Sequence, residues 1–251
     1  MAKFSGSGGT EGGNMVMYWP ENLPEDAERL LEEDPVTFLD TLSEEGRIIW
    51  FPNDGDGQFS ISVYLDEDPP APLKGFLGEE ENYPDVRVKG ATFFGGLECV
   101  GEEEPKLSDE YQGMFTQLAI PEGIYQGSVF RTFVPPTFSR SWLIERLGTR
   151  RYRILHWQQL LSRASFLGIV ACLFAFFFLK LPVWLGLVAV VASSFVAAVL
   201  LARSEACREA IVAIDEFTQL YPEFVVVLSS VPPEGITDPD STELALPVGS
   251  A

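Results

Sequence analysis

Two long apolar runs between Ala164 and Ala202 constrain this chain most, because Lys180 is the only charged residue among them. The runs cover residues 164–179 and 181–202 and meet at a Lys-Leu-Pro turn. As α-helices they would span about 24 and 33 Å, close to the roughly 30 Å of a hydrocarbon core. We therefore expect a transmembrane helical hairpin. The alternative is a hairpin buried in a soluble domain, which would need a much larger core because these helices are apolar on every face.

Charge is segregated around these runs. Residues 1–139 carry a net charge of −19, residues 140–203 carry +7, and residues 204–251 carry −8. Because the positive residues flank the apolar pair at its two outer ends, the positive-inside rule places both termini in the cytoplasm. The N-terminal residues lack the apolar region of a secretory signal. We expect a two-pass protein of the inner (cytoplasmic) membrane, without a nucleic-acid partner, since phosphate contacts need basic surfaces.

Side chains beside and within the runs indicate how the hairpin would contact its surroundings. Arginine and aromatic residues precede the first run and suit a layer of anionic lipid headgroups. These membrane-interface residues are Arg150, Arg151, Tyr152, Arg153 and Trp157. In the second run, Ala189, Ser193 and Ala197 form a ridge of small residues that lets helix backbones approach closely. We expect this ridge to pack against the first helix of the hairpin, with homodimerisation or docking on a membrane partner as the alternative.

Composition and periodicity divide the chain into six segments. Asp34-Pro35 predicts a helix start, so two short helices are expected at 24–33 and 35–44. The segments are a flexible N-terminus (1–17), an acidic cytosolic β-rich domain (18–136), a basic amphipathic juxtamembrane segment (137–163), the transmembrane hairpin (164–202), an amphipathic helix plus a strand that rejoins the domain (203–231), and a flexible tail (232–251).

The acidic domain shows the pattern of an antiparallel β structure. Residues 48–51 and 59–65 are β-prone and flank the turn signal 53–57, which predicts a hairpin. Further short strands are expected at 86–88, 91–94, 97–100, 117–120 and 125–133. Phe224–Leu228 is expected to add a strand to the same sheet, which makes the membrane hairpin an insertion. The predicted fold class is α+β, with an antiparallel β-sandwich-like domain, short helices and an inserted two-helix transmembrane hairpin.

Motifs that would carry chemistry are missing from the sequence. A calcium loop of the EF-hand kind at Asn53–Gly57 would need an acidic residue at Pro52 and a glutamate at Val63. The only histidine, His156, lies beside the first apolar run, and no glycine loop precedes a Lys-Ser or Lys-Thr pair. We expect no metal, no cofactor and no enzymatic activity. A pair of carboxylates acting as acid and base stays open.

Two segments, Gly46–Tyr64 and Ile120–Arg131, carry a family resemblance in their strand-turn patterns. Together they resemble the small β-sandwich domains found among predicted immunity proteins of bacterial polymorphic toxin systems. The resemblance covers residues 46–131 and does not reach the membrane hairpin. It implies a non-enzymatic binding protein that neutralises a protein toxin.

The acidity of the domain fits such a role, because an acidic face attracts a basic partner and speeds the encounter. We expect the acidic loops around the first strands to bind the partner, through Asp54, Asp56, Asp66, Glu67 and Asp68. The alternative function is a structural or regulatory subunit of an inner-membrane protein complex, docked on other membrane subunits through the hairpin.

Overall fold

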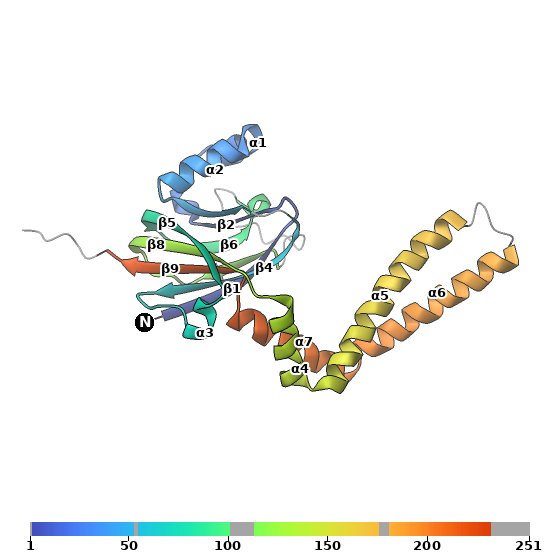
Figure 1. The fold of residues 1–251 in the computed structure, drawn as a ribbon. Helices are drawn as coiled ribbons and strands as arrows, with labels where there is room; N and C mark the ends of the chain where they lie inside the picture. The colour runs from blue at the N-terminus through green and yellow to red at the C-terminus, as the bar shows by residue number, and fades with distance from the viewer. Residues whose placement is uncertain (1, 53–54, 101–112, 176–180, 232–251) are drawn as a thin grey trace, which may run out of the picture. The chain divides into compact units, whose positions relative to one another are not determined.

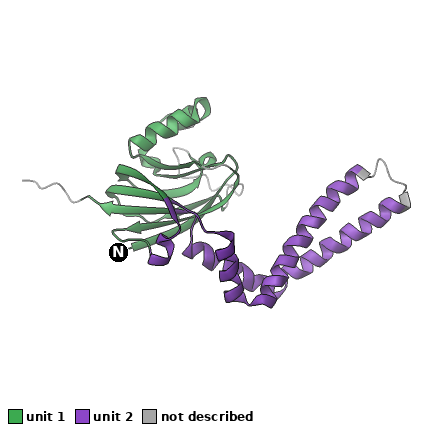
Figure 2. Ribbon diagram, in the orientation of Figure 1, with its two compact units in different colours: residues 1–69, 79–130, 225–251 green, residues 70–78, 131–224 purple. Residues whose placement is uncertain are grey.

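A computed structural model describes residues 2–52, 55–100, 113–175 and 181–231 of the 251-residue chain (Figure 1). These residues form an α+β structure with two β-sheets, which confirms the α+β part of the predicted class. The chain divides into two compact units (Figure 2). The β-rich unit comprises residues 1–69, 79–130 and 225–251, and the helical unit comprises residues 70–78 and 131–224. The expected flexible tail, 232–251, lies outside the described residues.

Two sheets and two short helices build the β-rich unit. The first sheet has the strand order β1-β4-β9-β8-β5, formed by β1 (Ala2–Thr10), β4 (Gly57–Leu65), β9 (Phe224–Ser230), β8 (Gly123–Thr132) and β5 (Leu77–Val88). The second has the order β3-β2-β6-β7, formed by β3 (Ile48–Pro52), β2 (Asn14–Tyr18), β6 (Thr92–Gly96) and β7 (Phe115–Leu118). The helices are α1 (Ala27–Glu33) and α2 (Pro35–Glu44). Single 3-10 turns form η1 (Pro20–Asn22) and η2 (Leu97–Cys99). The prediction of a strand at residues 97–100 is therefore wrong, because η2 lies there.

The prediction of a flexible N-terminus is wrong, because the glycine-rich start of the chain is strand β1. This strand pairs antiparallel with β4 along its whole length. It also contacts β7, and the Gly9 amide donates to the carbonyl of Met114, just before β7, at 2.9 Å. A Cβ atom on Gly8 would lie 2.9 Å from the Gly95 Cα and 2.9 Å from the Phe94 carbonyl oxygen. Close backbone packing therefore requires glycine at this position. A glycine in this segment thus serves close packing of a strand and does not indicate a flexible chain.

The predicted hairpin of residues 48–51 and 59–65 is also wrong, although both strands exist. Strand β3 pairs with β2, with Ile49 opposite Met17, whereas β4 pairs with β1, with Ile61 opposite Gly6. The two strands belong to different sheets. Alternating polarity tells which face of a strand is buried but does not identify the strand that pairs with it.

The second sheet is buried on both faces by apolar side chains. Alternate residues of β2 point to opposite faces, so Met15 and Met17 lie on one side and Val16 and Tyr18 on the other. Helix α2 packs on the second of these faces. It begins after Asp34, whose carboxylate accepts a hydrogen bond from the Thr37 amide, and Pro35 occupies the first turn. On the helix side, a buried cluster joins α1 and α2 to the sheet; it comprises Val16, Tyr18, Ala27, Phe38, Leu39, Leu42, Ile48 and Phe93.

Most of the helical unit, residues 131–224, lies in sequence between β8 and β9, and residues 70–78, with the short helix α3, complete it. Its helices are α3 (Ala71–Lys74), α4 (Pro136–Leu147), α5 (Thr149–Ala175), α6 (Leu181–Ala202) and α7 (Glu205–Leu220). Gly148, at φ 78°, separates α4 from α5. Aromatic rings then hold α4 and α7 together, with Phe138 5.3 Å from Tyr221 and Trp142 5.3 Å from Phe217 between ring centroids.

Candidate functional site

Helix α6 carries the apolar character that a membrane-spanning helix needs. Residues Val183–Ala202 are long and apolar enough to cross a bilayer, and 6% of this span is buried within the chain. Of the 20 large hydrophobic residues that the structure describes as exposed, 14 lie on α5 and α6. Contiguous exposed apolar surface of this kind is typical of membrane or protein contact and is rare on soluble monomers.

The other expected span, residues 164–179, is described only in part. The run 164–179 begins inside α5, whose described residues end at Ala175, and residues 176–180, with Lys180, lie outside the description. Among the described helices, α6 meets the length and hydropathy of a membrane span and α5 does not. Two membrane passes are therefore not supported by these residues and stay a prediction.

Helices α5 and α6 pack side by side (Figure 1). The indole nitrogen of Trp184 donates to the Cys172 carbonyl at 3.0 Å, and a Cβ on Gly168 would lie 2.6 Å from the Val191 side chain. Ala198 on α6 is also buried, with 4% of its surface exposed. Towards the residues 169–173 and 184–195, the helices leave an apolar recess of about 620 Å³ between them.

The small-residue ridge does not form this contact, contrary to the prediction. Ala189 and Ser193 are exposed and Ala197 is half-buried, so the ridge lies to one side of the face that meets α5. Trp184 and Val191 make contacts with α5 instead, at the Cys172 carbonyl and beside Gly168. The alternative use of the ridge, as a contact with a helix of another protein or a second copy, stays a prediction.

Polar side chains within α5 and α6 are satisfied by their own helices. The Ser193 hydroxyl donates to the Ala189 carbonyl at 2.8 Å, and Ser194 donates to Val190 at 3.0 Å. In α5, the Ser165 hydroxyl donates to Leu161 at 2.8 Å. A serine that bonds back to its own helix leaves no hydroxyl donor unpaired, which makes its presence in a lipid-facing helix inexpensive.

The predicted membrane-interface residues lie on the first turns of α5. Arg150, Arg153 and Trp157 are exposed, whereas Tyr152 is half-buried. Arg151 is exposed but pairs with Glu209 of α7, with Nε 2.9 Å from Oε2. The headgroup contact predicted for these residues stays a prediction, while Arg151 ties α5 to α7.

Helices α4, α5 and α7 form a small core next to these residues. Leu147, Leu155, Ala210 and Ala213 are buried together. The guanidinium of Arg146 donates two hydrogen bonds to the carboxylate of Glu216, at 2.7 and 2.8 Å. These hydrogen bonds lower the pKa of Glu216 and raise that of Arg146. Sequence reasoning missed this pair because the residues are 70 positions apart.

The predicted partner-binding acids do not form one surface. Asp56 is exposed just before β4, whereas Asp66, Glu67 and Asp68 follow the end of the same strand. A nine-residue strand separates its two ends by roughly 30 Å. Asp54 lies outside the described residues. The expected single acidic patch is therefore divided between the two ends of β4.

Asp66 has a structural role that the sequence did not indicate. It is the non-glycine residue with positive φ, 54°, in the described chain. Its carboxylate accepts hydrogen bonds from the amide and the hydroxyl of Ser230, both at 2.7 Å, and these lower its pKa. The Asp66 amide in turn donates to the Leu228 carbonyl at 2.8 Å. Both carboxylate oxygens of Asp66 thus hold the end of β9.

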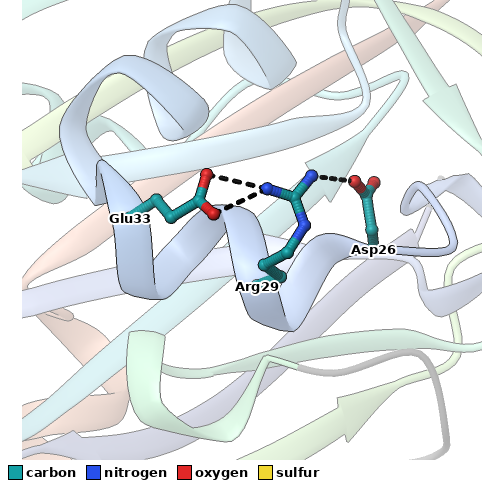
Figure 3. Close-up of polar contacts among 3 residues, drawn as sticks. All are labelled: Asp26, Arg29 and Glu33. Carbon is teal, nitrogen blue, oxygen red and sulfur yellow. Dashed lines mark hydrogen bonds and ion pairs between the residues drawn. The ribbon is translucent and has the colours of Figure 1, made fainter.

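Other acidic and basic groups of the β-rich unit are also engaged locally. In α1, Arg29 lies between Asp26 and Glu33 and pairs with both carboxylates (Figure 3). Glu98 receives hydrogen bonds from the Thr10 hydroxyl and the Glu11 amide, so it secures the turn between β1 and β2. Exposed pairs such as those of Arg29 add little stability, but they leave the helix surface acidic.

Strand β5 carries a further run of exposed acids, Glu79, Glu80 and Glu81. It is the last strand in the order of its sheet, and charged residues on an edge strand prevent pairing with other chains. Part of the acidity of the β-rich unit therefore has an explanation other than partner recognition.

The buried titratable groups of the β-rich unit are neutral packing residues. The Tyr18 hydroxyl donates to the Cys99 carbonyl at 2.8 Å, and burial raises the pKa of Tyr18. Burial also raises the pKa of the Cys99 thiol to about 11. Over the described ranges, no group of three His, Cys, Asp or Glu residues is arranged to hold a metal ion.

The chain has a weak likeness to a solved structure titled Crocagin biosynthetic gene J. The two share 14% identity with a TM-score of 0.38, over 56% of this chain and 82% of that one. At this level the likeness carries no argument. No family model and no curated protein matches the sequence.

Proposed function

We propose that this chain is a membrane-anchored, non-enzymatic binding protein, held in the inner membrane by α5 and α6, with its β-rich unit in the cytoplasm. The observation that carries the proposal is the exposed apolar surface of these two helices, together with the arginines Arg150 and Arg153 at its edge. Positive residues at the two outer ends of the hairpin support a two-pass topology with both termini in the cytoplasm.

Extraction and protease protection test the anchor. After alkaline carbonate washing, the full chain should stay in the membrane fraction. Protease added to spheroplasts should leave the β-rich unit intact, and the same protease should cut it after the membrane is opened with detergent. Cutting in intact spheroplasts would overturn the topology, and release by carbonate would overturn the anchor.

The partner in this proposal is a basic protein, and the resemblance to immunity proteins makes a toxin the favoured class. Support comes from the acidic exposed groups at both ends of β4 and from α1, where Arg29 is already held by two acids. Capture of such a partner should weaken as salt rises, because exposed charges are screened beyond about 10 Å at 0.1 M salt.

The division of the acidic residues shapes the experiment. Tagged protein is purified from its native membranes in mild detergent at low salt, and its partners are identified before and after a high-salt wash. Asp56→Lys and Glu67→Lys reverse charge at opposite ends of β4, and Glu205→Lys, on α7, is the matched control. Loss of a basic, salt-released partner in one β4 variant alone identifies the docking end. Unchanged capture in both variants would exclude both ends.

The second candidate function is a subunit of an inner-membrane complex. Exposure of Ala189 and Ser193 on α6, beside the face that meets α5, favours it. Ala189→Leu and Ser193→Leu should then release salt-resistant membrane partners. Val190→Leu, which enlarges a residue that is already large and exposed, should not.

A further inference from the structure

We draw no further inference here: the strongest candidate, the apolar recess of about 620 Å³ that α5 and α6 leave between them beside Trp184 and Phe195, is an unpartnered apolar face, and nothing in the structure shows what covers it.

Discussion

Replacing Gly8 by alanine should destabilise the β-rich unit, because the added methyl group has no room. Its Cβ would lie 2.9 Å from the Gly95 Cα, 2.9 Å from the Phe94 carbonyl oxygen and 3.0 Å from the Met114 carbonyl oxygen. All three are backbone atoms, which cannot move without shifting β6 and the start of β7. Overpacking of this kind costs about 1–3 kcal/mol of unfolding free energy. For a chain of this size that corresponds to a loss of about 2–12 °C in Tm.

Gly12→Ala is the matched control, because nothing lies within 4 Å of the added Cβ there. Its Tm should stay unchanged or rise slightly, since alanine restricts the unfolded chain more than glycine does. Tm is followed in detergent by near-UV circular dichroism, which reports the buried Trp19. Limited proteolysis of an N-terminal tag gives a second readout, because only the Gly8 variant should release the strand. Equal Tm values for the two variants would show that β1 is not packed as the structure has it.

Further predictions concern two buried residues of the β-rich unit, Thr92 and Cys99, and the hydrogen bonds of Asp66. Thr92→Val should cost about 1–3 kcal/mol of unfolding free energy, because the buried Trp19 indole N–H then loses the hydroxyl that accepts its hydrogen bond at 2.8 Å. Urea denaturation measures the unfolding free energy of both proteins. A loss below about 0.5 kcal/mol would contradict the prediction. Because hydrogen bonds from Ser230 lower the folded-state pKa of Asp66, its stabilising contribution should be present above the unfolded pKa of about 3.9 and be lost as pH falls through the folded value. Asp66→Asn should therefore lower Tm at pH 7 and narrow its difference from the unchanged protein below pH 4; a pH-independent difference would refute this. Cys99, with its pKa raised to about 11, should resist iodoacetamide at pH 8 until the protein unfolds, and rapid alkylation of the folded protein would contradict its burial.

Local patterns in the sequence predicted several elements closely. The helices at 24–33 and 35–44, the amphipathic helix that follows residue 203 and the strand from Phe224 all occur, with shifts of a few residues. Each of these signals lies within a few neighbouring residues: a cap, a proline, a glycine or a hydrophobic period. The apolar character of α6 is of the same kind, because composition alone makes this run long and apolar enough to cross a membrane.

Local sequence patterns could not predict which strands pair or which residues each charged side chain contacts. Gly6 meets Ile61 across β1 and β4, and the bonds between Asp66 and Ser230 join residues 164 positions apart. Nothing near Asp66 in the sequence distinguishes it from Asp68. The five acids predicted to bind a partner were grouped by sequence position, whereas a nine-residue strand separates Asp56 from the rest.

The sequence by itself determined the α+β class, the apolar run that suits a membrane and the sign of charge of each segment, because these follow from composition and short-range period. The tertiary structure decided that a glycine-rich start is a packed strand, that two adjacent strands belong to different sheets, and that Ala189 and Ser193 lie beside the helix contact instead of in it. The physical reason is the same throughout. Close packing and hydrogen bonding depend on which distant segments meet, and that is settled only when the whole chain satisfies its buried surface and its backbone groups together.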